Sequence, residues 1–264
     1  MAAHEVMHIA VAPPANLDAN LVRSVAAVIN KSPSYTRLLL AGEVPKVIAH
    51  YDSIQVAESV IQNLRDLGLV AIACTDSELR QFPQTFKAQT LEFGVKEVLF
   101  RDSAGREKRM VENDVFLILM GRTETSVEVE TTKPKTKFSL TGTLLMGGIP
   151  IWRKVDEKTT NRSIQTEYFA RLYDRKSSDP GVEILQHQIN YSFLGTKVAV
   201  SSSTNFGTVV LRLREIFPQA IFDDRLSKPL VLTTSSSQVW QAVEVSCKLI
   251  YLFHTVTSGQ FGNP

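Results

Sequence analysis

The segment Val44–Cys74 constrains the fold more than any other part of the chain, because it carries the start and stop signals of a β-α-β unit. Pro45 places the start of its first strand at a sheet edge, since proline cannot donate to the strand ladder. Asp52 predicts a helix cap, and Gly68 is typical of the left-handed residue that follows a helix. Between them, one helical face is apolar at Ile54, Ala57, Ile61 and Leu64. Strand, helix and strand in this order predict a parallel or split crossover.

The residues before this unit predict that it belongs to a larger domain. Val6–Val11 is a strand candidate, and a helical apolar face follows it. Ser32 and Pro33 form the start signal of a second helix, which Gly42 ends. The sequence therefore predicts an α+β protein that begins with a small β-α-α-β-α-β domain in residues 1–80, an ordinary domain size.

The segment AESVIQNLRDLG carries a family resemblance. Its Ala57, Glu58, Leu64 and Gly68 resemble the last helix of the C-terminal domain of the bacterial ribosomal stalk protein, a fold that the Clp protease adaptor shares. The resemblance covers roughly residues 5–76 and implies the shape of a docking module. It carries over neither ligand. The lysine-rich docking helix of the stalk family is reduced here to Lys31, Arg37 and Lys46, and the Asn-Asp-Asp loop of the adaptor family is missing from the sequence.

From residue 84 to residue 228 the pattern changes from helical to mainly β. Alternating segments predict strands at 86–93, 95–101, 163–174, 182–188 and 196–200, and a continuous apolar strand at 115–120 that Gly121 ends. Ser202 or Ser203 is expected to cap a helix at 204–217. This element order resembles the pleckstrin-homology superfold and its GRAM-like variants, a β-sandwich or barrel with a closing helix. The resemblance implies binding of phosphoinositides, peptides or proteins. A cationic first hairpin would provide an anion site at Lys96, Arg101, Lys108 and Arg109, diluted by neighbouring acidic residues.

A long hairpin insertion is expected at residues 122–162. Its two charged, threonine-rich arms predict an antiparallel ribbon, and an apolar, glycine-rich loop at 140–152 lies between them. The loop is expected either to pack back on the domain or on another subunit, or to contact a partner or a membrane. The candidate partner-binding residues are Leu144, Leu145, Met146, Ile149 and Trp152. The flanking candidate anion-binding residues are Lys133, Lys135 and Lys137.

Residues 229–264 are interpreted as a linker and a C-terminal helix. Apolar residues recur at helical spacing from Gln238 to Val256, and Glu244 and Lys248 are spaced as an i, i+4 ion pair. The helix is expected to pack on one of the domains, and its broad apolar surface also allows a dimer contact. Residues 140–152 are the alternative surface for homo-oligomer formation.

Composition bounds the class of protein. The chain has 264 residues, 44% hydrophobic content and a net charge of +2, which suit one or two ordinary domains and give no bulk attraction to nucleic acid. No eighteen-residue apolar run and no secretory signal pattern occur in the sequence. Its two cysteines make neither a disulfide framework nor a zinc set. The expected location is a reducing cytoplasm of bacterial type.

Sequence motifs for catalysis are missing. HExxH, CxxC, GxSxG, GxGxxG and phosphate-loop patterns do not occur, so no catalytic residue, metal site or cofactor is predicted. His4 and His8 are interpreted as part of a flexible start. Asp223 and Asp224 could bind a divalent cation, although a helix cap or a surface ion pair is the commoner role of such residues. Three functions follow: a non-enzymatic protein-binding or scaffolding adaptor, a peripheral membrane protein that uses the cationic hairpin and loop 140–152, or an enzyme with an unrecognised site.

Overall fold

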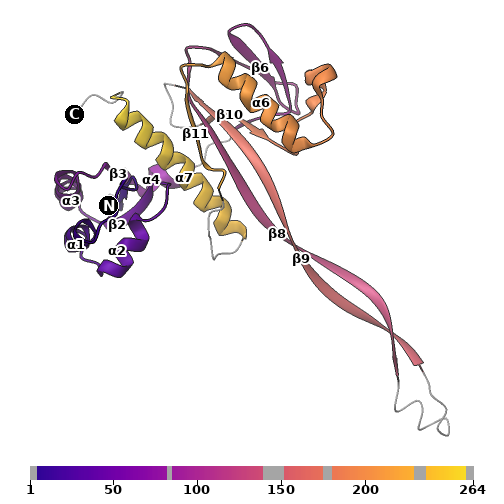
Figure 1. Cartoon of the computed structure of the whole chain (residues 1–264), viewed down its shortest axis with the longest axis horizontal. Coiled ribbons are helices and arrows are strands. Elements are labelled where there is room, and N and C mark those ends of the chain that lie inside the picture. Colours follow the sequence, from indigo (N-terminus) through magenta and orange to yellow (C-terminus); the bar gives the residue numbers. More distant parts are fainter. Residues whose placement is uncertain (1–4, 82–84, 139–151, 175–179, 229–235, 260–264) are drawn as a thin grey trace. The chain divides into compact units, whose positions relative to one another are not determined.

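The computed structural model describes residues 5–81, 85–138, 152–174, 180–228 and 236–259. It is a mixed α+β protein with several sheets, none of which is closed (Figure 1). The chain separates into two compact units. One comprises residues 1–123 and 167–264, and the other comprises residues 124–166.

The first part of the larger unit is a three-stranded sheet with helices. Its elements are β1 (Met7–Val11), α1 (Ala19–Val28), α2 (Pro33–Leu40), β2 (Lys46–Tyr51), α3 (Ile54–Asp66), β3 (Ala71–Thr75) and α4 (Asp76–Arg80). The strand order is β2-β1-β3, and β1 is antiparallel to both neighbours. Strands β2 and β3 are therefore parallel to each other with β1 between them, which is the split form of the predicted crossover.

Local signals explain the helix boundaries. The Ser32 side chain accepts a hydrogen bond from the Tyr35 amide, and Pro33 occupies the first turn of α2. Gly68 follows α3 at φ +80°, the left-handed conformation that its position predicts. The predicted cap Asp52 is wrong by one residue, because Ser53 is the N-cap of α3 and accepts from the Val56 amide. Residues Ala57, Ile61 and Leu64 of α3 are buried as predicted, whereas Ile54 is exposed.

The second part of this unit contains two sheets. The strands are β4 (Phe86–Ala88), β5 (Thr90–Phe93), β6 (Glu97–Arg101), β7 (Glu107–Val111), β8 (Val115–Phe138), β9 (Trp152–Asp174), β10 (Pro180–Leu185) and β11 (Ile221–Leu226). One sheet has the order β11-β8-β9-β10-β4, and the other has the order β5-β6-β7. The predicted hairpin with a turn at 102–105 is confirmed by β6 and β7. The predicted strand 86–93 is two strands, because the chain bends at Gln89.

Helix α6 (Ser202–Ile216) packs against both sheets. Its apolar face at Phe206, Val209, Val210, Leu213 and Phe217 is buried with residues of β6, β8, β9 and β10, as the sequence predicts. The predicted caps Ser202 and Ser203 lie inside the helix. The N-cap is Ser201, which makes no capping hydrogen bond through its side chain. The predicted strand 196–200 is also wrong, since the chain there leaves the 3-10 helix η1 (Tyr191–Lys197) without entering a strand.

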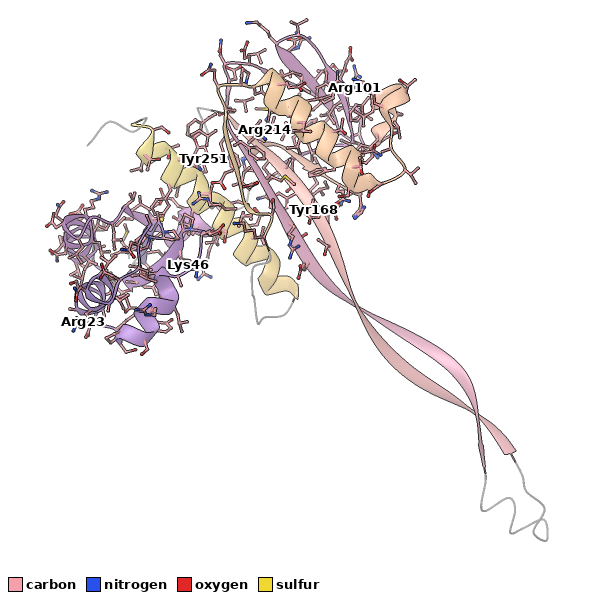
Figure 2. All side chains as sticks on the ribbon, viewed as in Figure 1. Arg23, Lys46, Arg101, Tyr168, Arg214 and Tyr251 are labelled. Carbon is pink, nitrogen blue, oxygen red and sulfur yellow. The ribbon has the colours of Figure 1, made fainter. Side chains whose placement is uncertain are left out.

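Helix α7 (Ser236–Thr257) is shared between the two parts of the larger unit. Val243, Cys247 and Ile250 join a buried cluster with β8 and β9. Leu249 and Phe253 join a second cluster with Ala10, Ile72, Cys74 and Leu79 of the first sheet and α4. Tyr251, labelled in Figure 2, stacks on Tyr173 with ring centroids 5.2 Å apart. The sequence predicts that this helix packs on one domain. The structure shows that its residues enter the cores of both parts of the larger unit.

Candidate functional site

The β8–β9 ribbon is the most distinctive surface element of the chain. We use this name for residues 124–138 and 152–166, which form the smaller compact unit. Strands β8 and β9 contain 24 and 23 residues, several times the usual strand length of about 5–6. They lie side by side and twist around each other (Figure 1). The Thr123 hydroxyl donates to the Glu167 carbonyl where the ribbon begins, and Figure 1 shows that the two strands run in opposite directions from there.

The close contact at Gly121 explains why β8 does not end where the sequence predicts. A Cβ atom at Gly121 would lie 2.3 Å from Cζ of Phe169 and 2.9 Å from Cβ of Leu226. Phe169 is on β9 and Leu226 is on β11, so this glycine lets a buried ring pack directly on the β8 backbone. Glycine marks a close backbone approach within a strand here, and β8 continues to Phe138.

Beyond the root of the ribbon, the two strands have only each other as neighbours among the described strands. Strand β11 pairs with β8 at Leu117–Gly121, and β10 pairs with β9 at Phe169–Tyr173. The sheet order gives neither strand another neighbour in the described part of the chain. The ribbon therefore presents two long outer edges, each a row of backbone donors and acceptors.

The predicted loop residues Leu144, Leu145, Met146 and Ile149 lie outside the described residues. Trp152 is the first residue of β9, and Lys133, Lys135 and Lys137 occupy alternate positions of β8 near its end. The ribbon thus connects the predicted partner-binding loop to the body, and whether that loop is exposed stays a prediction.

The predicted cationic hairpin is compensated by its own carboxylates. Lys96 pairs with Glu112 at 3.0 Å, and Arg109 pairs with Glu97 at 3.4 Å. Arg101, labelled in Figure 2, pairs with Glu107 at 2.7 Å and with Glu92 at 3.3 Å. Exposed pairs of this kind add little stability, but each offsets a cationic charge that would otherwise attract an anion. Lys108, on β7, is the fourth predicted anion-binding residue of this sheet.

A chain of hydrogen bonds joins two histidines to an aspartate in the first sheet. His8 Nδ1 lies 2.7 Å from His50 Nδ1, and His8 Nε2 lies 2.9 Å from Asp76 Oδ1. The two histidines face each other across β1 and β2. The hydrogen bond from His8 lowers the pKa of Asp76, while burial and the neighbouring His8 lower the pKa of His50. Such a chain can share and relay a proton.

This histidine chain corrects one interpretation of the sequence and adds residues that it missed. His8 is not in a flexible start, since it belongs to the central strand of its sheet; His4 lies outside the described residues. Residues 8, 50 and 76 are far apart in the sequence. Only the register that sets His8 opposite both His50 and Cys74 brings them together, and no local pattern encodes that register.

Asp223 and Asp224 do not converge on a common cation. Asp223 is buried on β11, where it accepts from Arg225 and lies 2.8 Å from His254 Nε2, while Asp224 is exposed. Burial opposes ionisation of Asp223, but the hydrogen bonds from His254 and Arg225 outweigh it and lower its pKa. Arg225 also donates to the Glu43 carbonyl, so this cluster joins β11, α7 and the loop before β2.

A second buried cluster centres on Arg171 of β9. Its guanidinium binds Glu183 of β10, with Nε 2.8 Å from Oε1, and binds Glu244 of α7 through both terminal nitrogens. The side chains of Arg171 and Glu183 are 3% and 5% exposed. Glu244, predicted to pair with Lys248, is therefore bound to Arg171, and Lys248 donates to the Gln81 carbonyl. The cluster attaches α7 to the sheet.

The chemistry available to the described residues is limited. No group of three or more histidine, cysteine, aspartate or glutamate residues in the described part of the chain could hold a metal ion. Burial raises the pKa of both Cys74 and Cys247 to about 12, so neither is a thiolate nucleophile near neutral pH. No helix among the described residues is both long and apolar enough to cross a membrane.

No family model, curated protein or solved structure gives a significant match to this chain.

Proposed function

We propose that this chain is a non-enzymatic protein-binding or scaffolding protein whose β8–β9 ribbon docks on another protein chain. The observation that carries the proposal is the pair of long outer edges in residues 122–138 and 152–168. A two-stranded ribbon is only marginally stable alone, and an unpaired edge is a ready template for another strand. Addition of a strand to such an edge is a recurring mode of protein recognition.

The first domain supports the same kind of role in a secondary way. Helix α2 carries Tyr35 and Leu38 at an i, i+3 spacing, 49% and 69% exposed, and apolar side chains so placed suit contact with a partner. Gly68, the helix pair and the split crossover support the stalk-like docking shape. The packing of α6 against two sheets supports the pleckstrin-homology-like arrangement, although the parallel pairs β4–β10 and β8–β11 depart from an all-antiparallel sandwich.

The experiment compares photo-cross-linking from the ribbon and from the body. A benzoylphenylalanine residue is placed at Val155 or Thr160 of β9, and at Val95 as the control, since Val95 is 94% exposed and lies between β5 and β6. The cross-linker is activated in the cells that make the protein, and the adducts are identified by mass spectrometry. We expect one defined protein adduct from both ribbon positions and none from Val95.

A ribbon-trimmed variant makes the test decisive. Residues 125–165 are replaced by Asn-Gly, which favours a tight turn between the remaining strands. A cooperative thermal unfolding transition with the midpoint of the parent would show that the body is intact, and the partner should no longer copurify. The same adduct from Val95, or retention of the partner by the folded trimmed variant, would overturn the proposal.

Membrane docking is the second candidate, and one observation favours it. Lys133, Lys135, Lys137, Arg153 and Lys154 surround the predicted apolar loop in the chain. The ion pairs of the β6–β7 hairpin count against a contribution from that hairpin. Sedimentation of the intact chain with phosphatidylserine vesicles, lost at high salt and in the trimmed variant, would favour this function over protein binding.

A further inference from the structure

Among the described strands, β9 has no second neighbour along the ribbon. Strand β10 reaches only Phe169–Tyr173, so residues 152–168 have no second neighbour among the described strands. This stretch contains neither proline nor glycine, and Val155, Thr159, Thr160 and Ile164 are good strand formers. At about 3.3 Å per residue, residues 152–166 provide an edge of about 50 Å for pairing.

The outer edge of β8 is less suited to pairing. Pro134 lies within it and has no backbone N–H to donate, a common device that protects an edge strand. The two edges of the ribbon are therefore not equivalent, and an added strand is expected on β9.

The charges of the ribbon complement those of a second, antiparallel ribbon. The half next to Thr123 and Glu167 carries Glu124, Glu128 and Glu130 against the single Arg162. The half next to residues 139–151 carries six cations, Lys133, Lys135, Lys137, Arg153, Lys154 and Lys158, against Asp156 and Glu157. Two copies that lie antiparallel place the cationic half of one ribbon alongside the acidic half of the other, with the glutamates of β8 one strand away from the facing β9 edge.

The full-overlap register is also matched residue by residue. When residues 152–166 of two copies pair completely and antiparallel, Thr159 lies on the two-fold axis and each residue faces its mirror position about Thr159. Asp156 and Arg162 are each three residues from Thr159, so each Asp156 faces an Arg162 of the other copy, twice per dimer. No two like charges face each other in this register, and opposite-charge pairs across strands are favourable.

We propose that the β9 edge pairs with the β9 edge of a second copy of this chain, in a two-fold dimer centred on Thr159. The dimer is a four-stranded sheet in the order β8-β9-β9-β8, and its interface is isologous. This inference rests on the proposed role of the ribbon in protein binding and names its partner.

The first test reverses the matched charges in the full chain. Asp156→Arg and Arg162→Asp each replace two attractive pairs by two repulsive ones. Each single variant is expected to raise the dimer dissociation constant roughly ten-fold or more in sedimentation equilibrium. An equimolar mixture of the two restores both attractive pairs in a heterodimer, and the double variant restores them in the homodimer. Glu157→Lys faces the neutral Asn161 in this register and is the matched control, expected to have a much smaller effect.

The second test locates the two-fold axis. A Thr159→Cys substitution places two thiols on facing residues of an antiparallel pair, within disulfide reach. Ser163→Cys is the control, because its two copies lie eight residues apart along the strands, about 26 Å. Cys74 and Cys247 are buried and do not compete. Mild oxidation should cross-link the first variant and leave the second unlinked.

The outcomes separate this inference from the proposed function. A monomer at every concentration, with an adduct to a different protein from Val155 and Thr160, would overturn the dimer and leave protein binding by the ribbon standing. A monomer with no ribbon adduct would overturn both. A dimer that survives in the folded ribbon-trimmed variant, or that is indifferent to both charge reversals, would place the contact elsewhere and overturn this assignment.

Discussion

Replacement of Arg171 by methionine is expected to remove about 3–5 kcal/mol from the free energy of unfolding. Arg171 is 3% exposed and holds Glu183, which is 5% exposed, and Glu244, which is 26% exposed. Methionine fills similar space but leaves a buried carboxylate without its cation, and breaking one side of a buried ion pair has this magnitude. Because Glu244 lies on α7, the loss also weakens the attachment of that helix.

The control is an arginine that also pairs with two carboxylates but lies on the protein surface. Arg101 also pairs with two carboxylates, Glu92 and Glu107, but its side chain is 41% exposed. Arg101→Met is expected to change stability by about 0–1 kcal/mol. Urea unfolding of the parent and of both variants, monitored by far-UV circular dichroism, gives their free energies of unfolding by linear extrapolation to water.

The pH dependence has a definite sign. Without Arg171, the buried carboxylate of Glu183 has lost the cation that binds it, and burial of an unpaired negative charge is unfavourable. The loss of stability in Arg171→Met relative to the parent should therefore become smaller as pH falls from 7 towards 5. The triple variant with methionine at 171, 183 and 244 should recover much of the loss. A loss equal to that of Arg101→Met, or a loss relative to the parent that does not shrink on acidification, would refute the buried-charge explanation.

Three further predictions test the rest of the structure. Gly121→Ala should destabilise the protein by about 1–3 kcal/mol in urea unfolding, because its Cβ would lie 2.3 Å from Phe169, whereas Gly207→Ala on α6, with nothing within 4 Å, should stabilise by about 0.5–1 kcal/mol. Burial and the nearby His8 and Lys31 lower the pKa of His50, so the stability of the protein should fall as pH drops below about 6.5. His50→Gln should weaken this pH dependence, and parallel curves of stability against pH for the two proteins would contradict the explanation. The lowered pKa of Asp223 gives stability that is present above about pH 4 and lost as pH falls further, so the advantage of the parent over Asp223→Asn should shrink on acidification, as thermal unfolding at each pH would show.

Elements with strong local signals could be predicted from the sequence. Three features depend on residues that are close together in the sequence: the apolar face of α6, the turn at Asp102–Gly105 and the left-handed Gly68. Helix boundaries were harder to predict where two neighbouring residues can both act as the N-cap. Asp52 and Ser53 can both cap α3, and the backbone conformation selects Ser53.

Features that depend on distant residues could not be predicted in this way. In the sequence, Gly121 is a signal for the end of a strand. In the structure, the Phe169 ring packs on Gly121 and the strand continues past it. Strand β11 was missed because Asp223–Arg225 has the composition of a cap or a surface turn. Asp223 is buried there, where Arg225 and His254 of α7 bind its carboxylate. The His8–His50–Asp76 chain requires a strand register, which sequence alternation alone does not fix.

The body shows how the two long strands are fixed at the point where the ribbon begins. At the root of the ribbon, Val115 and Ile118 of β8 enter the cluster that includes α6, while Phe116 and Leu117 enter the cluster that includes α7. On β9, Leu172 and Tyr173 divide between the same two clusters. Both strands are therefore held on both faces before the ribbon begins. Rigid attachment at the base is what a binding element needs, so this anchoring is consistent with the proposed role of the ribbon, whose sequence is rich in charge.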